Sequence, residues 1–178
     1  MKRLLTLLIP LLLPAPLLAA GFTLSSPQFS GQMALQQVHG GCGGDNVSPA
    51  LQWTDPPPGT RSFAVTLYDP DAPTGSGWWH WLLFDLPADQ RELAAGAGAQ
   101  ATRLLPKGAI QGMTDFGIAA YGGACPPKGD RPHRYVLTVH ALKVESLGID
   151  AKAMPAVAGF LINKHSLARA SLITYYGR

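Results

Sequence analysis

The chain has 178 residues and a formal net charge of +3, with 14 lysines and arginines against 11 aspartates and glutamates. Two of the positive charges, Lys2 and Arg3, precede an apolar stretch at the start of the chain, so the remainder is nearly neutral and long enough for one domain with a full-sized core. No stretch is rich enough in lysine and arginine to bind a phosphate backbone, which argues against a nucleic-acid-binding protein.

The first twenty residues have the organisation of a secretory signal peptide. A positively charged start is followed by an almost wholly apolar run over 4–18, and Ala19 and Ala20 supply small residues for cleavage. A transmembrane anchor is the alternative, but prolines interrupt the run, which is shorter than the roughly 20 apolar residues of a spanning helix. No cysteine directly follows to make a lipoprotein anchor. We therefore expect a signal peptide at 1–20, one domain at 21–178, and a periplasmic or secreted protein.

Alternating and apolar segments predict a mostly β domain. In chain order, strands are expected at 22–25, 33–38, 62–68, 79–86, 134–144 and 171–176. The clearest alternation places Phe63, Val65 and Leu67 on one face of a strand. Between the strands, loops rich in proline and glycine must leave regular structure, because proline fixes φ and lacks a backbone donor.

One helix is expected before the last strand. Pro155 suits a first helical turn, and apolar residues recur at helical spacing behind it. These residues are Val157, Phe160, Leu161 and Leu167. A mostly β chain with one late helix predicts two packed antiparallel sheets, although periodicity alone does not distinguish a sandwich from a barrel.

The two cysteines, Cys42 and Cys125, both lie in glycine-rich loops. In an exported protein paired thiols become disulfides, so we expect a bridge between them. The alternative is a reactive thiol at Cys125, which is followed by Pro126 and Pro127.

Three polar clusters lie in loops that flank predicted strands. Asp69 ends one strand, His80 opens the next among tryptophans, and His133 and Tyr135 open a third after the segment Cys125-Pro126-Pro127. An aspartate can orient an imidazole and favour its charged form, so that the imidazole donates to an anion. A second histidine and a tyrosine hydroxyl would add donors. Such a set suits a phosphate or carboxylate group better than a neutral sugar.

Each of these residues also has a purely structural interpretation. Asp69 and Asp71 could cap turns by accepting from local backbone donors. His80 could be a core histidine whose hydrogen bonds are satisfied, and Arg134 could form an ion pair with one of the aspartates. His133 and Tyr135 could be a strand-edge pair. The remaining histidines lack polar neighbours in sequence and are interpreted as structural: His39, His140 and His165.

Metal and catalytic sites find less support in the sequence. Asp69, His80 and His133 could form a two-histidine, one-carboxylate set, but their spacing matches no compact metal motif. No Gly-x-Ser-x-Gly nucleophile motif occurs. We therefore predict no cofactor, no metal and no catalytic residue. An acid–base pair of Asp69 and His80 acting on a small substrate is the remaining catalytic alternative.

Several sequence blocks, taken in order, are typical of one family. They are Gly-Asp-Asn-Val-Ser-Pro-Ala-Leu-Gln-Trp at 44–53, Asp-Pro-Asp-Ala-Pro at 69–73 followed by His80-Trp81, Thr-Asp-Phe-Gly at 114–117, Tyr-Gly-Gly-Ala-Cys-Pro-Pro-Lys-Gly at 121–129 with Pro-His-Arg-Tyr at 132–135, and Thr-Tyr-Tyr-Gly-Arg at 174–178. Together they resemble the phosphatidylethanolamine-binding protein family, in its bacterial, Raf-kinase-inhibitor-like branch. They cover nearly all of 21–178. Ala124 stands where that branch usually has proline, and Met113 and Thr114 replace a more polar pair.

The resemblance implies a two-sheet β-fold with a C-terminal helix and a small pocket for phosphate-like anions, including the phosphorylethanolamine head group. Carried over by motif, the ligand-binding residues would be Asp69, His80, His133 and Tyr135, with Cys125, Pro126 and Pro127 at the rim. Family members also inhibit kinase pathways and serine proteases, and fold alone does not decide between partners. A Raf-type kinase is cytosolic and does not suit an exported protein.

We therefore predict an exported, non-catalytic protein that binds a phosphate-like small molecule or a phospholipid head group, without nucleic acid and without a transmembrane anchor. In this prediction Asp69 orients His80, and His80 and His133 donate to the anion. The alternative is an inhibitor or regulator of a serine protease or another protein partner, in which the pocket would be incidental.

Overall fold

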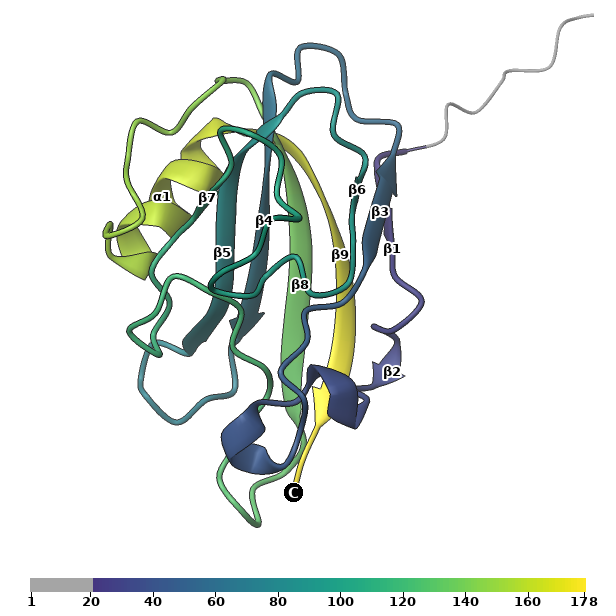
Figure 1. Cartoon of the computed structure of the whole chain (residues 1–178), viewed down its shortest axis with the longest axis vertical. Coiled ribbons are helices and arrows are strands. Elements are labelled where there is room, and N and C mark those ends of the chain that lie inside the picture. Colours follow the sequence, from purple (N-terminus) through teal and green to yellow (C-terminus); the bar gives the residue numbers. More distant parts are fainter. Residues whose placement is uncertain (1–20) are drawn as a thin grey trace, which may run out of the picture.

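Two β-sheets packed face to face form the part of the chain that the computed structural model describes, residues 21–178 (Figure 1). The predicted signal peptide at 1–20 lies outside the described residues. The smaller sheet has the order β1-β3-β6, with β1 at Thr23–Ser25, β3 at Leu51–Thr54 and β6 at Glu92–Leu93. The larger sheet has the order β2-β9-β8-β4-β5-β7, with β2 at Gly31–Gln32, β9 at Ser166–Tyr176, β8 at His133–Leu142, β4 at Ser62–Asp69, β5 at Trp78–Pro87 and β7 at Ile110–Gln111. Neighbouring strands run antiparallel, except for the parallel pair β2 and β9. The predicted fold class is confirmed.

The centre of the larger sheet is buried on both faces. Phe63, Val65 and Leu67 of β4 share the face predicted from their alternation, and they pack with Trp53 of the smaller sheet in the core between the sheets. On the opposite face, Ala64 belongs to a second apolar cluster under the helix. Because apolar burial drives folding and both β4 and β5 contribute residues to the two clusters, these strands lie at the centre of the domain.

Helix α1 (Pro155–His165) begins at the predicted residue, but of its predicted apolar residues only Leu161 packs against the apolar cluster under the helix. Phe160 is 64% exposed, and Leu167 lies beyond the helix, in β9. The buried residues of the helix are Ala158, Gly159 and Ile162. The helix lies so close to the sheet that a Cβ atom on Gly159 would stand 2.9 Å from the ring of Trp79, so only glycine fits there without a shift of the ring or the helix. Among residues 21–178, no helix is long and apolar enough to cross a membrane.

The strand predicted at 33–38 is wrong. Only Gly31–Gln32 pairs, in parallel with β9, and the chain then turns through the 3₁₀ helix η1 at Leu35–Gln37. The turn places Val38 beside Ala124, where the two residues form an isolated parallel bridge. The buried apolar residues of 33–38 therefore pack a loop against the loop that precedes β8, rather than forming one face of a strand.

The predicted disulfide between Cys42 and Cys125 is confirmed, with a distance of 5.6 Å between the two Cα atoms. Cys42 ends the 3₁₀ helix η2 (Gly40–Cys42), and Cys125 lies in the loop before β8. The bond and the adjacent bridge between Val38 and Ala124 therefore fasten the same two loops together. No free cysteine remains in the described part of the chain.

Removing this bond with the double substitution Cys42→Ser and Cys125→Ser should destabilise the domain. The bond closes a loop spanning 83 residues, and a loop of that length is expected to contribute about 4 kcal/mol by restricting the unfolded chain. Urea unfolding of the oxidised protein and the double variant measures the difference. Identical free energies of unfolding would show that the bond contributes nothing to stability.

Candidate functional site

A cavity of about 380 Å³ lies at the end of the larger sheet where β4 ends and β5 and β8 begin. Its lining includes every ligand-binding residue predicted from sequence: Asp69, His80, Cys125, Pro126, Pro127, His133 and Tyr135. It also includes residues that were not predicted, among them His39, Trp78 and Phe116. The structure thus brings the predicted set together from three strands and the loop before β8.

The sheet register explains why these residues converge. β4 lies between β5 and β8 and runs antiparallel to both, so its last residues face the first residues of its two neighbours. Asp69 pairs with Trp78 at the start of β5, and Tyr68 pairs with Val136 near the start of β8. The proline-rich loops that leave these strand ends then form the cavity rim.

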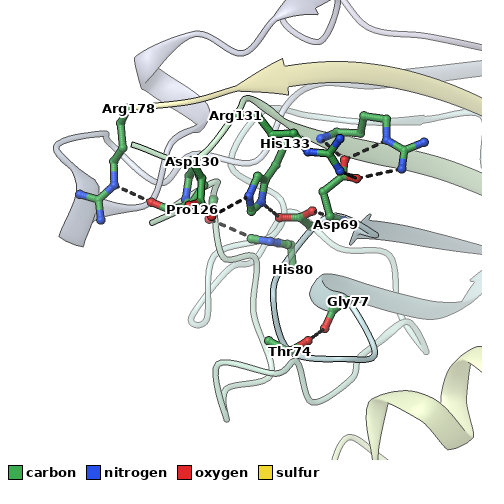
Figure 2. A network of polar contacts seen from close by, with 12 residues as sticks. Asp69, Thr74, Gly77, His80, Pro126, Asp130, Arg131, His133 and Arg178 are labelled. Carbon is green, nitrogen blue, oxygen red and sulfur yellow. Dashed lines mark hydrogen bonds and ion pairs between the residues drawn. The ribbon is translucent and has the colours of Figure 1, made fainter. Parts of the chain in front are cut away.

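Asp69 is hydrogen-bonded to His133 rather than to His80 (Figure 2). Its Oδ2 atom lies 2.8 Å from Nδ1 of His133, and its Oδ1 atom accepts from the backbone N–H of Asp71 at 2.8 Å. The expected pairing of Asp69 with His80 is therefore wrong. The acid–base pair considered for these two residues would need the same contact, which is not formed. On the other side of the His133 ring, Nε2 lies 3.4 Å from a carboxylate oxygen of Asp130.

His80 is held instead by two backbone carbonyls. Its Nδ1 atom lies 2.8 Å from the oxygen of Gly122 and 3.1 Å from that of Gly123. A carbonyl oxygen only accepts, so this environment assigns the ring proton to Nδ1. Burial lowers the pKa of His80 from 6.5 to about 4, against the opposing effect of the carbonyls and of Asp69. The ring is therefore neutral at pH 7, and its Nε2 atom is an acceptor, which corrects the expected role of His80 as a donor.

Two buried donors in the cavity wall have no hydrogen-bond partner within residues 21–178: the hydroxyl of Tyr135 and the indole N–H of Trp78. Burial, the negative charge of Asp69 and a weak contact of the hydroxyl with that carboxylate raise the pKa of Tyr135 above its ordinary value, against a weak contact with the backbone of Cys125, so the hydroxyl keeps its proton. Buried polar groups are normally paired, and each unpaired one therefore needs an explanation.

His39, interpreted from sequence as structural, belongs to the cavity. Its Nδ1 atom accepts from the backbone N–H of Gly41 at 3.1 Å, which leaves Nε2 as the protonated nitrogen of the neutral ring. The ring stacks on Phe116 with centroids 5.0 Å apart. The available sequence signal was its position three residues before Cys42, because the disulfide joins that turn to the rim.

The loop after β4 is fixed by the ion pair predicted for Arg134. Its Nε and Nη2 atoms donate to the two carboxylate oxygens of Asp71 at 2.8 and 2.9 Å, and its backbone N–H donates at 2.9 Å. The hydrogen-bonded guanidinium holds the pKa of Asp71 well below its ordinary value. The rim on the opposite side is held by Arg178, whose Nε donates to the oxygen of Pro126 at 2.7 Å (Figure 2).

We expect the imidazole of His80 to stay neutral well below the pH at which an ordinary histidine is charged. Its NMR signals should remain unchanged from pH 7 to about pH 5.5 and move only as the pH approaches 4, the lowered pKa. Since the unfolded chain takes up this proton near pH 6.5, stability is lost as the pH falls from 6.5 towards 4. A titration midpoint for His80 above 6 would contradict the neutral assignment.

Comparisons with known proteins agree with this architecture. A model of the phosphatidylethanolamine-binding protein family matches residues 25–177. Two Escherichia coli proteins, YbcL and YbhB, are 51% and 53% identical over 136 residues, which are 76% of this chain and 74% and 85% of those proteins. The crystal structure of E. coli YbcL, described as a new member of the mammalian family, covers 89% of this chain and 99% of its own, with a TM-score of 0.87 and 45% identity. The chain therefore belongs to the phosphatidylethanolamine-binding protein family.

Proposed function

We propose that this chain is an exported, non-catalytic binding protein whose cavity holds a phosphate-like anion, either free or as part of a head group. The hydroxyl of Tyr135 carries this proposal, because it lies near Asp69 and Cys125 but forms no hydrogen bond of normal geometry within residues 21–178. An unpaired buried hydroxyl costs about 1–3 kcal/mol, a cost that an acceptor brought by a ligand would remove. The family's name refers to phosphatidylethanolamine, whose head group contains such an acceptor.

The donors around the cavity suit an anion. The cavity wall contains three donors: the hydroxyl of Tyr135, the indole N–H of Trp78 and the Nε2–H of His39. His133 adds a second imidazole to the wall, which Asp69 holds in place at Nδ1 and whose Nε2 atom lies 3.4 Å from a carboxylate oxygen of Asp130. Prolines and aromatic rings form much of the remaining lining. Such walls exclude water and so strengthen the hydrogen bonds made inside the cavity.

Export is part of the same proposal. The arrangement of charge, apolar run and small residues at 1–20 supports it, and so does the disulfide, since such bonds persist mainly in oxidising compartments. The cavity would then meet anions outside the cytoplasm, and its partners would be found there.

Substituting Tyr135 by phenylalanine should weaken anion binding and at the same time stabilise the domain. The variant loses a donor to the ligand, but it also loses a buried hydroxyl that has no partner in the chain. We expect the free energy of unfolding to rise by about 1 kcal/mol. Urea unfolding, together with an NMR titration with phosphorylethanolamine, measures both effects.

Tyr121→Phe is the matched control. The hydroxyl of Tyr121 is also buried, but it donates to the backbone oxygen of Gln37 at 2.7 Å, away from the cavity. This variant should lose about 1 kcal/mol of stability and bind phosphorylethanolamine normally. If Tyr135→Phe binds as well as the unsubstituted protein does, the cavity is not the anion site.

A further inference from the structure

The cavity offers an acceptor as well as donors, and the acceptor belongs to His80. The Nδ1 proton of this ring is taken by the oxygens of Gly122 and Gly123, at 2.8 and 3.1 Å. Its Nε2 atom forms no hydrogen bond with any residue in 21–178, and the ring lines the cavity. A lone pair is therefore directed toward the cavity, where a bound ligand can donate a proton to it.

The orientation of this ring is difficult to change. Turning it over would place a carbon atom against Gly122 and Gly123 and leave two buried carbonyls without their donor. The rings of Tyr135 and Phe116 also press edge-on against it, with centroids 5.2 and 5.3 Å away. The loss of these buried hydrogen bonds would cost more free energy than one new hydrogen bond to a ligand would contribute. The acceptor at Nε2 is therefore a fixed property of the cavity.

On the basis of the anion-binding function above, we propose that the cavity selects an oxyanion that still carries a proton, namely a phosphate monoester in its singly protonated form or inorganic phosphate as dihydrogen phosphate, whose P–O–H group donates to Nε2 of His80. A fully deprotonated oxygen at this position would set one lone pair against another. Sulfate, which has the same shape but no proton near neutral pH, should therefore be rejected, as should a phosphodiester.

The charged groups around His80 favour the same form of the ligand. Asp69 and Asp130 place carboxylates on either side of His133, so a doubly charged anion would meet more repulsion than a singly charged one. The other titratable groups facing the ring are His39 and Tyr135. Burial keeps the pKa of His80 low, so the ring does not readily supply the missing proton itself.

Calorimetric titrations of the oxidised protein at about pH 5.5 test this selectivity, because a phosphate monoester, with a second pKa of about 6, is then mostly singly protonated. We expect inorganic phosphate to bind at least about tenfold more tightly than sulfate at equal ionic strength. Methyl phosphate should follow phosphate, and dimethyl phosphate should follow sulfate. These last two ligands separate a free monoester from the diester chemistry of a phospholipid.

A pH series and a variant complete the test. Raising the pH to about 8 removes the remaining proton of methyl phosphate and should lower the ratio of methyl phosphate to sulfate affinity, while sulfate corrects for changes in the protein. His80→Phe should bring the ratio close to one, whereas His165→Phe, on a histidine outside the cavity, should leave it unchanged. The pH series decides the matter if His80→Phe does not fold.

Equal binding of phosphate and sulfate at both pH values would overturn the selectivity while leaving the anion site intact. Tight binding of glycerophosphorylethanolamine without discrimination between phosphate and sulfate would also overturn it, because the donor to His80 would then be the ammonium group. If none of these anions binds, the proposed anion-binding function fails as well.

Discussion

The hydrogen bond between Asp69 and His133 joins the last residue of β4 to the first residue of β8, and the geometry of the cavity depends on it. Both side chains are almost completely buried, and burying either one without a hydrogen-bond partner would be costly in free energy. Because the carboxylate also accepts from the backbone of Asp71, it fixes the direction in which the proline-rich loop leaves the strand. One buried contact thus sets both the position of an imidazole and the course of a rim loop.

The cavity rim is held at several points by different kinds of bond. On one side, the ion pair of Arg134 with Asp71 fixes the loop after β4. On the other, the disulfide at Cys125 and the hydrogen bond from Arg178 to Pro126 hold the loop before β8. A binding site whose loops are restrained in this way loses little conformational freedom when a ligand enters, which favours affinity for small ligands with few contacts.

Much of this architecture follows from patterns that are visible in the sequence. The alternation at Phe63, Val65 and Leu67 predicts the buried face of β4, and polar residues at strand ends predict a site at one end of the sheet. The resemblance to a known family identified seven lining residues in advance. These predictions concern residue types and order along the chain, which local chemistry constrains strongly.

Other features depend on contacts that no local pattern encodes. The proton of His80 is assigned by two carbonyls more than forty residues away in sequence, and His39 joins the cavity only through folding of its loop against the rim. The helix buries its small residues because Trp79 approaches Gly159, a contact that periodicity alone cannot reveal. The same limit explains the missed turn at Leu35–Gln37, where apolar residues pack between loops.

The disulfide also has a consequence for folding. Its two cysteines are 83 residues apart, and the segment between them contains β3, β4 and β5, so most of the domain core lies inside the loop that the bond closes. Contacts of such high contact order form slowly compared with local ones. The central pairing of β4 with β8 joins residues that lie about as far apart in the sequence as the two cysteines, so the core and the rim both depend on long-range closure. Forming either closure brings the ends of this segment together and lowers the entropy cost of forming the other.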